Sequence, residues 1–105
     1  MGTESSETAR VTRDLRALGA EVFVCDARSP SHVPGWPDRV IVHPRIGTAL
    51  VEFKHGTSPR PVQRMMLDRL RRKGACVVVI DLRTISTAEG VLEEIEKQLF
   101  SKESP

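Results

Sequence analysis

The sequence predicts an α/β domain with a mixed sheet, in the order helix, three strands, helix, strand and helix. Apolar residues recur at helical spacing near both ends, two short β-branched runs flank a turn, and a fully apolar run follows a basic helix. A chain of 105 residues has room for one hydrophobic core. Residues 1–105 are therefore expected to form one domain, with residues 1–4 and 101–105 frayed.

The first helix, strand and loop follow from spacing and composition. A helix is predicted over residues 5–18, whose apolar stripe is Val11, Leu15 and Leu18. Residues 21–25 are read as the first strand, and residues 26–37, rich in proline and serine, as a loop. Trp36 in this loop either packs over the core or an interface, which we favour, or stacks on nucleic acid.

The second and third strands are predicted to form a hairpin that carries charges. Residues 38–42 and 50–54 are the strands, and residues 43–48, with a proline and a glycine, form the turn. Glu52 and Lys54 are two positions apart, so they point to the same face of their strand.

The register of this hairpin decides whether Asp38 joins that face. A two-residue loop would place Asp38 opposite Phe53, on the wrong face. A three-residue loop at residues 45–47 would place Asp38 opposite Lys54, on the face that also carries Glu52. We therefore expect an odd loop or a bulge, with two carboxylates and one ammonium converging on one side.

Such a cluster suits a divalent metal. Carboxylates that are buried at the ends of apolar strands require a cation, because burying an unpaired charge costs free energy. Two carboxylates with water suit Mg²⁺ or Mn²⁺, which can polarise a phosphoryl oxygen and help generate a hydroxide. An ordinary cross-strand salt bridge is the alternative at this point.

These residues, with those that follow, resemble the PD-(D/E)XK nuclease superfamily, and more narrowly its VRR-Nuc branch. The resemblance covers residues 7–81 and rests on the ordered motifs Pro37-Asp38, Glu52-Phe53-Lys54, Ser58-Pro59 and Gln63. It implies a restriction-endonuclease-like αβββαβ core plus a C-terminal helix, and metal-dependent cleavage of DNA. Small stand-alone phage and bacterial members resemble dimeric Holliday-junction resolvases, which implies a bacterial cell and allows a phage origin.

The resemblance also implies roles for single residues. Asp38 and Glu52 would bind the metal, and Lys54 would assist the nucleophile. Gln63 would support the site; the alternative is an exposed helix glutamine. Glu7 is our choice for a helix-borne carboxylate at the metal, unless it only complements the helix dipole.

Glu4 is held in reserve for that helix-borne role. Phe53, where the family more often has an aliphatic residue, is a mild departure.

Positive charge gathers between residues 38 and 73. That segment has nine basic and three acidic residues, a net +6, while the rest of the chain carries −4. A DNA phosphate surface needs such polarity. The expected DNA contacts are Arg39, His55, Arg60 and Arg64, whereas residues 69–73 are read as a solvated helix face.

The remaining elements are a basic helix, a buried strand and a final helix. Ser58-Pro59 is read as the start of a helix that runs to about Lys73 and buries Val62, Met65, Met66, Leu67 and Leu70. Residues 75–80 are continuously apolar, so a parallel strand covered on both faces is expected. Ser86 and Glu89 are read as a capping box opening the last helix, and Asp81 as a turn residue.

The cysteines and the hydropathy of the sequence indicate the cellular compartment of the protein. Cys25 and Cys76 lack metal-site or disulfide spacing, and His32, His43 and His55 are not spaced as ligands. No apolar run reaches membrane-spanning length, so a cytoplasmic protein is expected.

The function predicted is a Mg²⁺-dependent, structure-selective DNA endonuclease acting as a C2 homodimer on four-way or other branched junctions. The alternative from another class is a catalytically silent DNA-binding or scaffold homodimer with the same fold. A nuclease acting on linear duplex is a further possibility.

Overall fold

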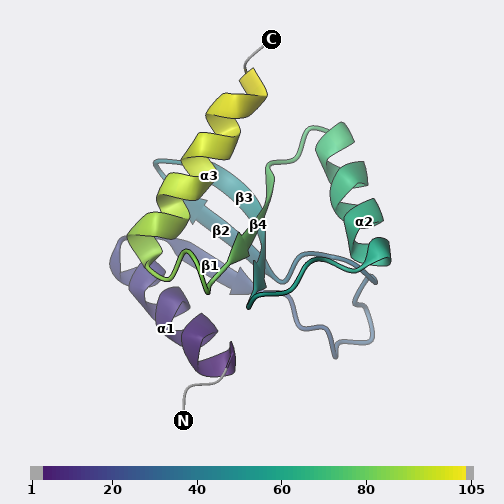
Figure 1. Ribbon diagram of the computed structural model, residues 1–105, viewed down its shortest axis with the longest axis horizontal. Coiled ribbons are helices and arrows are strands. Elements are labelled where there is room, and N and C mark those ends of the chain that lie inside the picture. The colour runs from purple at the N-terminus through teal and green to yellow at the C-terminus, as the bar shows by residue number, and fades with distance from the viewer. Residues whose placement is uncertain (1–3, 104–105) are drawn as a thin grey trace.

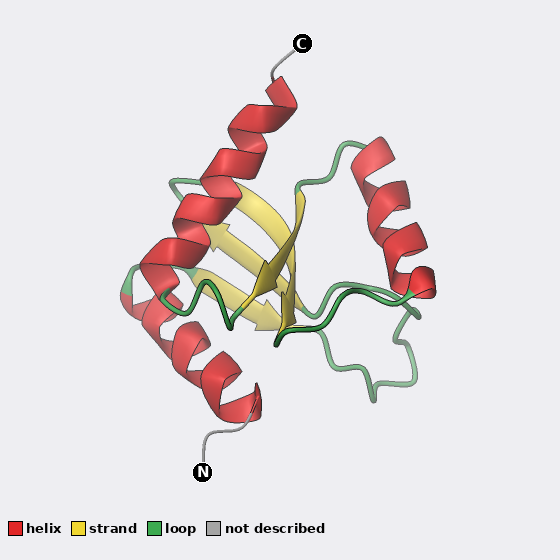
Figure 2. Ribbon diagram, in the orientation of Figure 1, coloured by secondary structure: helices red, strands yellow, loops and turns green. Residues whose placement is uncertain are grey.

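The computed structural model describes residues 4–103, and the side chains of residues 6–100 (Figure 1). The predicted element order is confirmed in this part of the chain (Figure 2). The bounds are α1 Glu4–Ala17, β1 Glu21–Val24, β2 Arg39–His43, β3 Gly47–Lys54, α2 Pro61–Arg72, β4 Val77–Asp81 and α3 Ala88–Glu103.

The four strands form one mixed sheet in the order β1-β2-β3-β4. β1, β2 and β3 are antiparallel neighbours, whereas β4 runs parallel to β3. The parallel pair requires a crossover, and α2 supplies it. In Figure 1, α1 and α3 lie side by side on one face of the sheet, and α2 lies on the other.

The main core lies between the sheet and the α1–α3 layer. Val11 and Leu15 of α1 pack there with Ile41 of β2, Val51 of β3 and Ile95 of α3, all fully buried. Because side chains alternate along a strand, the residues between these core positions face the other way. Glu52 and Lys54 are therefore on the face that α2 partly covers.

The helix α2 begins two residues later than expected. Arg60, not Ser58, is its N-cap, and Pro61 stands in its first turn. Arg60 has φ −70° and ψ 161°, the extended conformation that a following proline enforces. The second proline of the segment therefore fixes the start of the helix.

The prediction that α2 buries an apolar stripe was largely wrong. Only Leu67 is fully buried among its residues, while Val62 and Met65 are 55% and 67% exposed. The helix meets the sheet mainly along β4, so one side of its stripe remains uncovered.

The helix α3 begins after Thr87, whose Oγ1 accepts a hydrogen bond from the Gly90 N–H at 3.0 Å. Thr87, not Ser86, is therefore the N-cap. Glu89, expected to complete a capping box, instead forms an ion pair with Arg45 of the hairpin turn at 2.6 Å. The helix ends at Glu103.

Three smaller expectations can be compared with the structure. Cys25 and Cys76 are not joined in a disulfide, and both are half-buried, whereas their place at the edges of apolar runs predicted buried thiols. Asp81 is a turn residue, as predicted, because its Oδ1 accepts the Arg83 and Gly56 N–H groups, both at 2.9 Å. Those two backbone donors lower the pKa of Asp81. None of the helices among residues 4–103 is long and apolar enough to cross a membrane.

Candidate active site

The candidate site is built where β2 begins and β3 ends. The backbone N–H of Asp38 donates to Glu52 Oε1 at 3.1 Å, and Asp38 Oδ1 accepts the Phe53 N–H at 3.3 Å. Glu52 Oε2 lies 3.2 Å from Lys54 Nζ. The structure thus brings together the two carboxylates and the ammonium that the sequence placed on one face.

The hairpin that aligns them has an odd loop, as predicted, but a different register. Arg39 pairs with Val51 and His43 with Gly47, so the loop is residues 44–46 and the step before Arg39 faces Glu52 rather than Lys54. Gly47, at φ +69°, takes the left-handed position that closes three-residue hairpins. The two-residue shift preserves the alternation of faces, so the cluster survives it.

Burial and charge set the electrostatics of this cluster. Glu52 is 7% exposed, and its only described cationic partner is Lys54. Burial, followed by the neighbouring Glu52 charge, raises the pKa of Asp38 to about 6. Lys54 offsets Glu52, whereas the Asp38 carboxylate has only a longer ion pair, with Arg39 Nη1 3.9 Å from its Oδ2.

The donor set fits a hard divalent cation. Mg²⁺ prefers oxygen ligands, keeps several waters, and is usually bound through one or two protein carboxylates. Asp38 and Glu52 supply that pair, and a cation between them would stabilise the ionised form of Asp38. Among the described side chains of residues 6–100, no three of His, Cys, Asp or Glu lie close enough to share one metal.

Glu7 is not brought to the carboxylate pair in this geometry. Its Oε1 pairs with Arg10 at 3.0 Å, and Arg10 also donates to the Ser86 carbonyl at 2.8 Å. This places Glu7 toward the start of α3. The side chain of Glu4, the reserve candidate, lies outside the described residues.

Gln63 is half-buried and lies beside the loop that leads into Asp38. A Cβ added to Gly35 would come within 2.9 Å of the Val62 carbonyl oxygen and 3.1 Å of Gln63 Cα. The first turn of α2 therefore packs against the segment three residues before Asp38.

The close approach at Gly35 yields a matched pair of substitutions. Gly35→Ala combines a positive φ of +84° with a backbone clash, whereas Gly47→Ala has φ +69° and open space. We expect Gly47→Ala to cost about 1 kcal/mol and Gly35→Ala about 2–4 kcal/mol in the free energy of unfolding. Urea unfolding of both variants measures this, and equal losses would show that Gly35 does not fix the loop against α2.

The expected DNA-contacting residues have different surroundings. Arg60 and Arg64 are exposed on α2. His55 Nε2 is hydrogen-bonded to Thr8 Oγ1 of α1 at 3.2 Å, which ties the end of β3 to that helix. Arg39 is mostly buried: its guanidinium lies 5.8 Å from the centre of the Phe53 ring and donates to the Asp38 carbonyl at 2.9 Å. Arg45, part of the basic segment, is instead held by Glu89 and Glu96 of α3.

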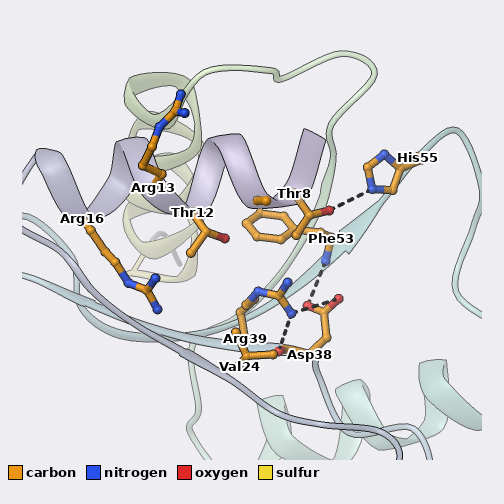
Figure 3. A pocket seen from close by; sticks show the side chains of 10 residues that line it. Thr8, Thr12, Arg13, Arg16, Val24, Asp38, Arg39, Phe53 and His55 are labelled. Atoms are coloured by element: carbon orange, nitrogen blue, oxygen red, sulfur yellow. Dashed lines mark hydrogen bonds and ion pairs between the residues drawn. The ribbon is translucent and has the colours of Figure 1, made fainter. Parts of the chain in front are cut away.

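Sequence reasoning missed a hollow that adjoins Asp38 on the α1 side. This pocket, about 540 Å³, is lined by Thr12, Arg13 and Arg16 of α1 and by Asp38 and Arg39. In Figure 3 Thr12 and Arg16 extend from α1 toward Arg39, whereas the Arg13 side chain extends away from it. The two α1 arginines are three positions apart, a spacing that was visible in the sequence. Their relation to Asp38 depends on how α1 docks, which no local pattern encodes.

Comparison with solved structures gives a match over nearly the whole chain. A structure titled "VRR_NUC domain" is 26% identical, covers 92% of this chain and 94% of its own, and superposes with a TM-score of 0.58. No protein-family model and no curated protein matches the sequence. The structural match supports the family that the Asp38 and Glu52-Phe53-Lys54 motifs predicted.

Proposed function

We propose that this protein, whose motifs and fold place it in the VRR-Nuc branch of the PD-(D/E)XK nuclease superfamily, is a metal-dependent DNA endonuclease. The observation that carries the proposal is the convergence of three side chains: Glu52 contacts the Asp38 N–H and the Lys54 ammonium, and the Asp38 carboxylate accepts the N–H of the residue between Glu52 and Lys54. An ordinary salt bridge would need one carboxylate. The second, Asp38, keeps a raised pKa although Arg39 Nη1 lies 3.9 Å from it, and a bound metal cation would favour its ionised form.

Each residue has a role that follows from its position. Asp38 and Glu52 would hold Mg²⁺ or Mn²⁺, which supplies polarisation of a phosphoryl oxygen and a lowered pKa of bound water. The Lys54 ammonium, 3.2 Å from Glu52, would orient the attacking water or offset charge on the phosphorus. Gln63 supports the site from the first turn of α2.

A helix-borne carboxylate remains part of the proposal. Glu7 was the first choice, but its pairing with Arg10 at 3.0 Å occupies it elsewhere. Thr8 contacts His55 at the end of β3. Because residues four apart share a helix face, Glu4 stands one turn before Thr8 on the same face of α1. Matched Glu4→Gln and Glu7→Gln variants therefore separate the two candidates by their cleavage rates.

The proposed substrate is DNA with four-way or other branches, and the proposed assembly is a C2 homodimer. Two cuts on one junction require two sites, and a core this small gains stability from association. The loop before Asp38 and α3 are the proposed interfaces, and each presents an exposed apolar residue: Val33 is 47% and Phe100 is 65% exposed. Sedimentation equilibrium measures the oligomeric state directly.

The test of function is cleavage of labelled DNA with and without divalent metal. We expect cuts in four-way junctions with Mg²⁺ or Mn²⁺, slower cutting of flaps and linear duplex, and none with EDTA. Preferential cutting of linear duplex would replace junction selectivity with a restriction-like activity. Absence of cutting with any metal, together with junction binding, would favour the scaffold homodimer instead.

A further inference from the structure

We propose that the pocket between α1 and the sheet binds a phosphate of the DNA strand, with its sugar, next to the phosphate that is cut. This inference rests on the proposed nuclease function. It assigns to α1 a part in holding DNA that the sequence had given to the exposed arginines of α2.

The charge of the pocket suits an anion. Arg13, Arg16 and Arg39 line it, and Asp38 is the one acidic side chain among the lining residues that the structure describes. The Arg39 side chain is 14% exposed, and its Nε is buried without a hydrogen-bond partner among the described residues. This guanidinium lies over the Phe53 ring and its Nη1 contacts the Asp38 carbonyl at 2.9 Å and the Asp38 carboxylate at 3.9 Å, so it is already fixed in place and loses little freedom when it binds phosphate.

Thr12 provides a second unsatisfied polar group in the pocket wall. It is 7% exposed, and its Oγ1 is buried without a partner in the described part of the chain. Buried hydroxyls are normally hydrogen-bonded, so an orphaned one suggests a missing ligand. In Figure 3 the Thr12 side chain extends from α1 toward the side that carries Arg39. A phosphate oxygen there would accept its proton.

The remaining two arginines differ in how they are held. Arg16 reaches toward the sheet and donates to the Val22 carbonyl at 2.8 Å, leaving its other N–H groups for a ligand (Figure 3). Arg13 is 74% exposed at the rim and pairs with Asp14 at 3.2 Å. An exposed pair of this kind contributes little, so Arg13 can turn toward an anion at small cost.

Size and position complete the argument. A pocket of about 540 Å³ falls within the roughly 300–1,000 Å³ typical of ligand sites, more than a phosphate alone requires. Val24 and Phe53 add apolar surface on which a sugar can lie. Because Asp38 belongs to both this pocket and the carboxylate pair, a strand with one phosphate at the pair would place its neighbour in the pocket.

The test is junction binding by fluorescence anisotropy in EDTA, where no cutting occurs. We expect Arg13→Gln/Arg16→Gln to raise Kd at least tenfold and to reduce the slope of log Kd against log salt by about one, as loss of a phosphate contact predicts. Arg69→Gln/Arg72→Gln removes the same charge from the exposed far end of α2 and should change Kd less than threefold. Arg13→Gln alone, a substitution at the exposed rim, should raise Kd about threefold without altering folding.

The outcomes separate this inference from the nuclease proposal. If the wild-type protein cuts DNA but the Arg13/Arg16 variant binds it within twofold of wild type, the pocket inference is overturned and the nuclease proposal stands. If that variant loses affinity while the wild-type protein never cuts, the pocket stands and the nuclease proposal fails. Equal losses from the Arg69/Arg72 control would also overturn the pocket, since general charge would then account for binding.

Discussion

Asp38→Asn is expected to reduce DNA cleavage by at least about 1,000-fold while leaving the fold intact. Asparagine has the same shape and can still accept the Phe53 N–H bond that holds this side chain at 3.3 Å. It loses the negative charge that a divalent metal requires. Cleavage rates of a four-way junction at saturating Mg²⁺ measure the loss, and a variant that cuts within tenfold of wild type would remove Asp38 from the metal site.

The same substitution has an opposite, pH-dependent effect on metal-free stability. The pKa of Asp38 is raised from 3.8 to about 6, so ionisation is easier in the unfolded chain than in the folded one. The stability that protonated Asp38 contributes to the folded state is therefore fully present below about pH 4 and is lost as the pH rises through about 6. Because the Asp38 side chain is 35% exposed, screening reduces the effect to about 1–2 kcal/mol at pH 8. Asp38→Asn should then unfold at a higher temperature than wild type in EDTA.

Mg²⁺ should reverse this order. A ligand that binds only the folded state raises stability in proportion to its saturation, and the wild-type protein alone keeps both carboxylates. Thermal unfolding at pH 8 should therefore give the variant the higher midpoint in EDTA and the wild-type protein the higher midpoint in Mg²⁺. At pH 4 the two proteins should unfold alike. A wild-type protein more stable than the variant in EDTA at pH 8 would contradict the raised pKa.

The faces of the strands were predictable, whereas the register and the helix start were not. Strand alternation alone placed Glu52 and Lys54 on one side, and any odd loop would bring Asp38 there. The loop at residues 44–46 depended on which residue took the left-handed position, and only the structure identifies Gly47. Likewise two prolines could open α2, and the choice depends on the backbone that each imposes on its predecessor.

Contacts between distant elements account for what the sequence left out. The pocket at Arg13 and Arg16 exists because α1 docks beside β1 and the start of β2, a relation set by the whole core. The exposure of Met65 on α2 has the same origin, since its burial depends on how much of the sheet the helix covers. The count of charges along the sequence also overstated the positive surface, because Glu89 and Glu96 of α3 form ion pairs with Arg45. Local patterns define an element, but docking decides which of its faces is available.

Lys54→Met is expected to damage both stability and cleavage, for separable reasons. Lys54 and Glu52 form a pair 3.2 Å apart with side chains only 18% and 9% exposed. Removing one partner of a buried pair leaves the other charge uncompensated and costs about 3–5 kcal/mol. The matched control, Lys97→Met, removes an ammonium from a pair with Glu94 whose lysine is 77% exposed, and should cost less than about 0.5 kcal/mol.

A double variant distinguishes the structural role of Lys54 from its chemical one. Glu52→Gln/Lys54→Met removes both charges, and the introduced glutamine can still accept the Asp38 N–H bond that Glu52 now accepts at 3.1 Å. Most of the lost stability should return, giving a coupling energy of about 2–3 kcal/mol in urea unfolding. Cleavage should not return, because a metal ligand and the ammonium are both absent. Additive stability losses would show that the pair is not coupled in the folded protein, and recovered cleavage would show that neither charge serves the reaction.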